Sequence, residues 1–167
     1  MNFTAYARER QPEEIVQTLN RIFTMFDRLV DEGGLEKIKT IGDAYMVAGG
    51  LSERCEDHPR RMASLALDMM ASMEGLQRDG APFMLRIGLH IGPAIAGVIG
   101  KTKFAYDLWG DAVNAASRME STGVDGRIQV SEAFRQSVGD GFAFEERGGV
   151  EIKGRGRMHT YFLTGRA

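Results

Sequence analysis

One segment of this chain constrains the fold more than any other, because residues 12–32 carry a single apolar stripe. Apolar side chains recur there at steps of three and four residues, which is the spacing of one face of an α-helix. The stripe consists of Ile15, Val16, Leu19, Ile22, Phe23, Phe26, Leu29 and Val30. Pro12 suits the first helical turn, and Gly33 and Gly34 end the pattern. A helix with one apolar face must bury that face against another layer of structure.

The rest of the chain predicts short strands that alternate with further helices. Residues 35–40 and 44–48 are expected to form strands around a turn at Ile41-Gly42-Asp43, and residues 59–78 a second amphipathic helix with a methionine-rich core face. The later elements expected are strands at 84–90 and 94–99 joined at Gly92-Pro93, a strand at 104–108, a helix at 111–120, a strand at 128–130, a short helix capped by Ser131, and strands near 142–146, 150–153 and 160–163. This order favours one α+β domain with helices packed on a largely antiparallel sheet.

Composition excludes several classes of protein. The chain has 167 residues, and its 21 Lys and Arg nearly balance 23 Asp and Glu, for a net charge of −2. That balance does not favour nucleic-acid or membrane-surface binding. The single cysteine, Cys55, favours a reducing compartment, and no apolar run approaches the ~18 residues of a membrane span. We expect a cytoplasmic domain without a nucleic-acid partner and without direct membrane insertion, any membrane tether lying in segments outside this chain.

Two familiar kinds of site are absent from the sequence. Gly100-Lys101-Thr102 resembles the end of a phosphate-binding P-loop, but that motif needs a glycine where the chain has Ile95. The histidines share no metal-ligand spacing with Cys55. His90 lies in an apolar strand and is expected to be structural.

Three other groups of polar residues are candidates for a site. Asp43 at a glycine turn between strands has the oxygen chemistry of a ligand for a hard cation, although turn-forming aspartates are common. Asn114 and Arg118 stand four residues apart on a predicted helix, so they share one face, which is either a ligand-binding or a solvated face. Lys153 and Arg155 lie between glycines, where they either meet a polyphosphate or form a solvated loop.

Taken together, these groups resemble the catalytic domain of the class III nucleotidyl cyclases, the adenylyl and guanylyl cyclases. The motifs that carry the resemblance are Lys39-Thr40-Ile41-Gly42-Asp43-Ala44-Tyr45-Met46, Leu85-Arg86-Ile87-Gly88-Leu89-His90-Ile91-Gly92-Pro93, Trp109-Gly110-Asp111-Ala112-Val113-Asn114 and Thr160-Tyr161-Phe162-Leu163. The resemblance covers nearly the whole chain, so residues 1–167 are expected to be one cyclase catalytic domain. It implies an α+β fold with a ferredoxin-like (palm-type) sheet on which helices pack.

The resemblance also implies an activity. In this family ATP or GTP is cyclised between two catalytic domains, where the ribose 3′ oxygen attacks the α-phosphate and pyrophosphate leaves. Two divalent cations, Mg²⁺ or Mn²⁺, assist the displacement. Asp43 matches one metal-binding aspartate, Asn114 the residue that orients the ribose, and Arg118 the residue that stabilises charge in the transition state. Lys153 matches the phosphate-contacting lysine, with Arg155 close enough in sequence to take that role instead.

Base choice follows from two further positions. Lys39 and Asp107 match the residues with which the family reads the purine. Adenine offers an acceptor at N1 and a donor at its amine, which an ammonium and a carboxylate complement, whereas guanylyl cyclases typically carry Glu and Cys. The resemblance therefore implies an adenylate cyclase that makes cyclic AMP from ATP. It also implies a homodimer, because Asp43 and the Lys39/Asp107 set would serve a shared site from opposite subunits.

The start of the chain departs from the family pattern. The family's other metal-binding aspartate lies on an opening strand, a few residues before a Phe-Thr pair. Phe3 and Thr4 resemble that pair and are expected to line the triphosphate through backbone N–H groups, but the chain begins at Met1. We therefore expect the opening strand and its aspartate to be missing and the 167 residues alone to cyclise ATP poorly.

Two alternatives stay open. One is a non-catalytic, nucleotide-binding and dimerising cyclase-like regulatory module, which a missing strand favours and the retained Asp43, Asn114 and Arg118 oppose. The other is a guanylate cyclase, which Lys39 and Asp107 oppose.

Overall fold

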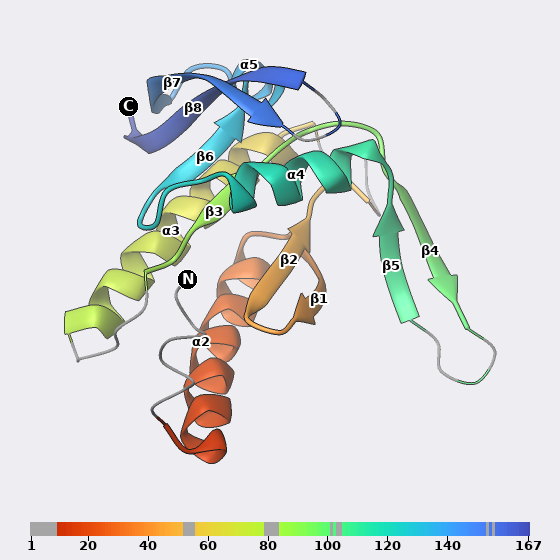
Figure 1. The fold of residues 1–167 in the computed structure, drawn as a ribbon, viewed down its shortest axis with the longest axis vertical. Helices are drawn as coiled ribbons and strands as arrows, with labels where there is room; N and C mark the ends of the chain where they lie inside the picture. The colour runs from red at the N-terminus through yellow and green to blue at the C-terminus, as the bar shows by residue number, and fades with distance from the viewer. Residues whose placement is uncertain are drawn as a thin grey trace.

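The computed structural model describes residues 10–51, 56–78, 84–100, 102, 105–152, 154 and 156–167. The elements follow one another as α2 (Pro12–Glu32), β1 (Glu36–Ile41), β2 (Ala44–Ala48), α3 (His58–Arg78), β3 (Ile87–Leu89), β4 (Ile95–Ile99), β5 (Ala105–Trp109), α4 (Asp111–Ser121), β6 (Ile128–Ser131), α5 (Glu132–Val138), β7 (Phe142–Ile152) and β8 (Gly156–Arg166) (Figure 1). The expected α+β class is confirmed. The expectation about an opening strand falls on residues 1–9, which lie outside the described ranges.

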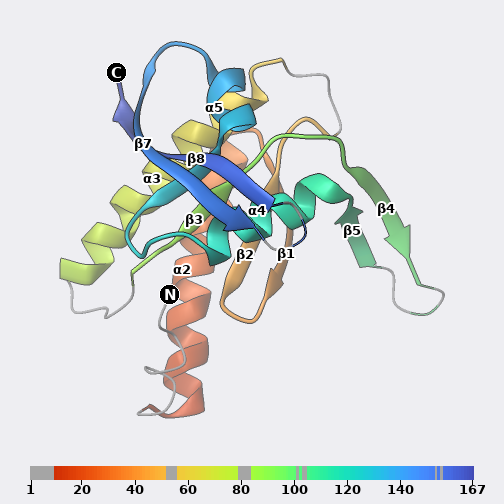
Figure 2. The ribbon, with the colours of Figure 1, turned by 45° about the horizontal axis from the view of Figure 1, so that its top comes forward.

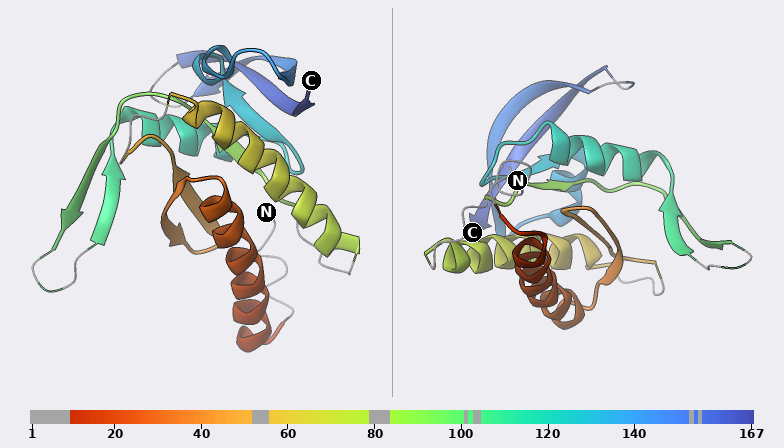
Figure 3. Two further views of the ribbon diagram at one scale, coloured as in Figure 1. Left: turned by 180° about the vertical axis from the view of Figure 1, so that it is seen from behind. Right: turned by 60° about the horizontal axis from the view of Figure 1, so that its bottom comes forward.

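A four-stranded mixed sheet in the order β3-β6-β8-β7 forms the centre of the fold. β3 runs parallel to β6, while β8 pairs antiparallel with both β6 and β7. Helices cover both faces: α3 and α5 bury one face, and α4 lies along β3 on the other (Figures 2 and 3). The core between α3, α5 and the sheet contains Ala63, Ala66, Leu89, Ile128, Val130, Phe134, Val138 and Leu163.

The second half of helix α2 packs as its apolar stripe predicts, whereas Val16 in the first half is exposed. Ile22, Phe26 and Val30, each four residues apart, are its buried side chains, and they pack with Met69 and Met73 of α3. The methionine face of α3 is therefore core, as expected. Within the described ranges, no helix is both long enough and apolar enough to cross a bilayer.

The observed strands differ from the expectation in two places. The strand expected at 84–90 is shorter, with β3 covering only Ile87–Leu89, and it lies beside β6 in the main sheet, whereas β4 pairs with β5. Near the C-terminus, β7 is one strand rather than two. It continues through the glycines at 148 and 149 by a register shift between Glu146 and Gly148, an irregularity that bends a strand without ending it.

The β4–β5 hairpin extends away from the main sheet (Figures 1 and 3). Its register runs from Ile95 opposite Trp109 to Ile99 opposite Ala105. Several of its apolar side chains are exposed, namely Ile95, Val98, Ile99, Tyr106 and Trp109. A cluster of exposed apolar side chains on a projecting arm is typical of an interaction surface rather than of a solvated loop.

Candidate functional site

Lys39 and Asp107 form the centre of the candidate site. Lys39 lies on β1 and Asp107 on β5, and Lys39 Nζ donates a hydrogen bond of 2.5 Å to Asp107 Oδ2. The other carboxylate oxygen accepts from the backbone N–H of Leu108 at 2.8 Å. The hydrogen bond from Lys39, supported by that backbone N–H, lowers the pKa of Asp107 below its ordinary value. Both side chains remain partly open to solvent, so a ligand can reach them.

A bulge in β1 separates the roles of two nearby lysines. The register shifts between Lys37 and Lys39, so the pairing with β2 skips one residue. Lys37 reaches α2, where its Nζ lies 2.7 Å from Asp27 Oδ1, while Lys39 reaches β5. A bulge re-aims side chains in this way. It places one of two similar lysines at the candidate site.

Asp43 occupies the tip of the β1–β2 hairpin. Ile41 pairs with Ala44, so Gly42 and Asp43 form a two-residue turn. Gly42 has a φ of +61°, and left-handed backbone at the first central position is the reason such turns take glycine there. Asp43 is half-buried at this turn, where the short backbone connection between two paired strands sets its place.

Helix α4 presents Asn114 and Arg118 to solvent. Both side chains are exposed, while Ala115 and Met119 on the opposite side of the helix are buried. The predicted shared face of Asn114 and Arg118 is therefore confirmed. The helix begins directly after Gly110, whose φ is +138°.

The fold brings together only part of the predicted site. Lys39 and Asp107 are in contact, but no hydrogen bond or ion pair within the described ranges joins Asp43, Asn114 or Arg118 to them. The other candidates, Phe3, Thr4, Lys153 and Arg155, lie outside those ranges.

Asp43 is the one candidate metal ligand that the described residues contain. Its carboxylate has the hard oxygen donors that Mg²⁺ and Mn²⁺ prefer. No group of three or more His, Cys, Asp or Glu side chains with metal-binding geometry occurs in the described part of the chain. Asp43 therefore fits a divalent cation as a single ligand and needs further ligands from elsewhere.

Sequence reasoning missed a polar cluster behind the β1–β2 hairpin. The Tyr45 hydroxyl donates to Asp27 Oδ1 at 2.5 Å, beside the bond from Lys37. Burial, followed by this hydrogen bond to Asp27, raises the pKa of Tyr45. The cluster fixes the hairpin to α2. No pattern in the sequence indicates it, because its members come from three different elements. His90 directly follows β3 rather than lying within it, and its Nδ1 lies 2.7 Å from the hydroxyl of buried Ser131.

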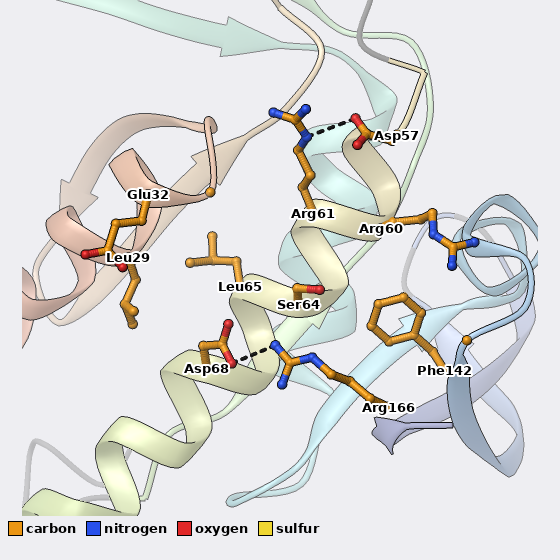
Figure 4. A pocket seen from close by; sticks show the side chains of 12 residues that line it. Leu29, Glu32, Asp57, Arg60, Arg61, Ser64, Leu65, Asp68, Phe142 and Arg166 are labelled. Carbon is orange, nitrogen blue, oxygen red and sulfur yellow. Dashed lines mark hydrogen bonds and ion pairs between the residues drawn. The ribbon is translucent and has the colours of Figure 1, made fainter.

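A cavity of about 710 Å³ lies elsewhere, between α2, α3 and the C-terminal strand (Figure 4). Ion pairs at its wall join Arg61 to Asp57 and Arg166 to Asp68. None of the predicted site residues that the structure describes lines it, so the cavity is separate from Lys39, Asp43, Asp107, Asn114 and Arg118.

The chain matches the family described as the adenylate and guanylate cyclase catalytic domain over residues 1–165. It belongs to this family. The cyclase domain is 46% identical over 167 residues to an adenylate cyclase of Mycobacterium tuberculosis, covering 99% of this chain and 38% of that protein. It is 43% identical over 166 residues to the human guanylate cyclase soluble subunit beta-2, covering 98% of this chain and 27% of that protein. The chain thus spans well under half the length of these curated relatives.

Solved structures give the same family. The guanylate cyclase domain of RhGC from Catenaria anguillulae, in complex with GTP, is 34% identical to this cyclase domain and superimposes with a TM-score of 0.91. The match covers 100% of this chain and 92% of that one. The ferredoxin-like cyclase architecture expected from the motifs is therefore confirmed. Relatives carry the names of both adenylate and guanylate cyclases, so the family establishes a nucleotidyl cyclase domain without deciding the base.

Proposed function

We propose that residues 1–167 form an adenylate cyclase catalytic domain that converts ATP to 3′,5′-cyclic AMP and pyrophosphate. The ribose 3′ oxygen forms a new bond to the α-phosphorus and loses its proton, and the bond from the α-phosphorus to the bridging oxygen of pyrophosphate breaks. The observation that carries the choice of ATP is the contact between Lys39 and Asp107.

The chemistry of this pair is complementary to adenine. An ammonium donates to the N1 acceptor of adenine, and a carboxylate accepts from its exocyclic amine. Guanine presents donors at N1 and the 2-amine and an acceptor at O6, so Lys39 and Asp107 would have to exchange places to serve it. A site of hydrogen-bonding groups rejects the wrong base because its own groups would then lie unpaired.

The remaining site residues take the roles that the family resemblance implies. Arg118, at the exposed face of α4, stabilises negative charge that develops on the phosphoryl group, and Asn114 orients the ribose. Asp43 supplies one carboxylate for a divalent cation. When bound, two such cations, Mg²⁺ or Mn²⁺, activate the attacking oxygen and neutralise the phosphates. Lys153 or Arg155, and the backbone of Phe3 and Thr4, contact the phosphates.

The same geometry favours a dimer of two copies of this chain. Within the described ranges, Asp43 makes no hydrogen bond or ion pair with Lys39 or Asp107, as expected if a second copy completes the site. The exposed apolar side chains of the β4–β5 hairpin provide a surface that a second copy would cover.

The test is product identification with the full-length protein that carries these residues. Purified protein is incubated with ATP or GTP and with Mg²⁺ or Mn²⁺, and products are identified by mass spectrometry. We expect cyclic AMP, with kcat/KM higher for ATP than for GTP. Cyclic GMP as the main product would contradict the base assignment. Nucleotide binding without any cyclic product would favour the regulatory module instead.

A further inference from the structure

A buried side chain of the central sheet is bonded to the helix that carries Arg118. Gln129 on β6 is 0% exposed, and its Nε2 donates to the Thr122 hydroxyl at 3.0 Å. Thr122 immediately follows α4, and its hydroxyl donates to the backbone carbonyl of Arg118 at 2.7 Å. Two hydrogen bonds in series therefore link the middle of the sheet to the backbone of Arg118.

The direction of these bonds is determined by the single hydrogen on the hydroxyl. Because Thr122 Oγ1 donates to the Arg118 carbonyl, it can only accept from Gln129. The amide of Gln129 must therefore present its NH₂ group to Thr122. Its oxygen, Oε1, is left buried with no hydrogen-bond partner among the described residues.

An unpaired buried amide oxygen lowers stability, since the group loses its bonds to water and gains none in the fold. The Gln129 amide lies against the sulfur of Met119, at 3.8 Å from Nε2, and this neighbourhood suits an apolar side chain of the same length. Stability alone does not explain a glutamine at this position. Its bond to Thr122 is the property that an apolar side chain would not supply.

Two further contacts tie the same end of α4 to the sheet. Arg147 on β7 donates to the Thr122 carbonyl at 2.7 Å. At Gly88 on β3 the backbones meet so closely that a Cβ would lie 2.0 Å from Glu120 N. Thr122 is thus the point where contacts from β6 and β7 converge on the last turn of α4.

We propose that Gln129 and Thr122 are positioning residues, which hold the last turn of α4 so that Arg118 points into the catalytic site. The inference rests on the proposed function, in which Arg118 stabilises the phosphoryl group. Neither residue needs to touch the nucleotide. Their effect passes through the backbone carbonyl of Arg118.

The first experiment replaces Gln129 by methionine in the full-length protein. Gln129→Met removes both the buried unpaired oxygen and the bond to Thr122 while keeping the length of the side chain. We expect an equal or higher Tm together with a kcat about tenfold lower and a KM for ATP within about twofold, because misplacing a catalytic group slows the chemical step. An unchanged kcat, or a kcat that falls only in step with Tm, overturns the proposal.

Two more sets of variants separate positioning from packing. Thr122→Val removes the hydroxyl and should lower kcat as much as Gln129→Met does. Thr122→Ser keeps the hydroxyl, so its kcat should stay within about twofold of the parent value. Gln136→Met makes the same chemical change at an exposed position on α5 and should leave kcat unchanged. A kcat of Thr122→Ser as low as that of Thr122→Val overturns the proposal.

A readout that needs no activity keeps this inference distinct from the proposed function. Amide hydrogen exchange across the last turn of α4 should be faster in Gln129→Met and Thr122→Val than in the parent and in Thr122→Ser. If the full-length protein makes no cyclic nucleotide, the proposed function fails, and hydrogen exchange alone decides the positioning role. Exchange that is unchanged in Gln129→Met overturns that role.

Discussion

Lys39 and Asp107 stand 68 positions apart in the chain, yet Lys39 Nζ lies 2.5 Å from Asp107 Oδ2. In this arrangement the Lys39 ammonium and the Asp107 carboxylate neutralise each other's charge. A purine that binds between them has to replace one charged hydrogen bond by two bonds to its own edge. Under the proposed function, only a base with an acceptor and a donor in the matching order compensates for the loss of the ion pair, so we expect the pair to disfavour the wrong base.

The paired substitution Lys39→Glu with Asp107→Cys should shift the preference from ATP toward GTP. We expect the ratio of kcat/KM for ATP to that for GTP to fall at least about tenfold, because the donor and acceptor order is reversed. The measurement is steady-state kinetics on both nucleotides. A double variant that cyclises ATP with an unchanged ratio contradicts the base assignment.

Lys37 provides the matched control for this experiment. It lies on the same strand but bonds to Asp27 on α2. Lys37→Glu should reduce thermal stability, since it brings two carboxylates together. The variant should keep the same ratio of kcat/KM for ATP to kcat/KM for GTP as the parent protein.

Acid titration tests the ion pair directly. The hydrogen bond from Lys39 lowers the pKa of Asp107, so its stabilisation is present above the unfolded pKa of ~3.9 and is lost as pH falls through the lower folded value. Lys39→Met should therefore raise the pKa of Asp107, as followed by carbon-13 NMR of the carboxyl group. If the Asp107 carboxyl group titrated with the same midpoint pH in the parent and in Lys39→Met, Lys39 would not act on Asp107.

Arg118→Ala should reduce kcat by ~10²–10³, the range found when one group that stabilises transition-state charge is removed. Arg118 is exposed on α4, so the variant should fold with an unchanged Tm. KM for ATP should change little if the contact forms mainly in the transition state. An equal loss in ATP affinity would assign Arg118 to ground-state binding instead.

Gly88→Ala should separate α4 from the sheet. A Cβ at Gly88 would lie 2.0 Å from Glu120 N and 2.6 Å from Glu120 Cα, which are backbone atoms that cannot rotate away. We expect a loss of at least ~2 kcal/mol in the free energy of unfolding, measured by urea denaturation.

Gly75→Ala is the matched control on α3, where a Cβ would meet nothing within 4 Å. It should raise the free energy of unfolding by ~0.5–1 kcal/mol, because alanine favours a helix interior. Similar losses in the two glycine variants would contradict the proposed close contact at Gly88.

Val98→Glu on the β4–β5 hairpin should weaken the proposed dimer. Val98 is 60% exposed, so the glutamate is tolerated in the single chain, but a second copy covering the hairpin would have to bury its charge. We expect the dimer dissociation constant to rise about tenfold or more, measured by sedimentation equilibrium. Val16 on α2 is 64% exposed, and Val16→Glu should leave the dimer dissociation constant unchanged. An equal effect of both changes would place the interface elsewhere.

Local patterns were enough to predict most elements of this fold. The apolar stripe predicts a helix at Pro12–Glu32, which is the helix observed, and Ser131 accepts from the Phe134 N–H as the predicted cap of α5. The motif around Asn114 predicts a helix with two polar residues on one face, as observed. Helical periodicity and capping depend on residues within a few positions of one another, so the sequence carries them directly.

Pairings between distant elements needed the folded chain. The sequence predicts strands on either side of Gly92-Pro93 but not their partners, and β3 pairs in parallel with β6, far along the chain. It places Lys39 and Asp107 in one site through their motifs, but their contact depends on how the β1–β2 and β4–β5 hairpins meet. The sequence does not predict the hydrogen bond between Gln129 and Thr122, because a glutamine within an apolar strand does not indicate which residue it will bond to. Local chemistry thus determines the elements and the candidate residues, while packing between layers determines which side chains meet, because those contacts form only when the elements are assembled.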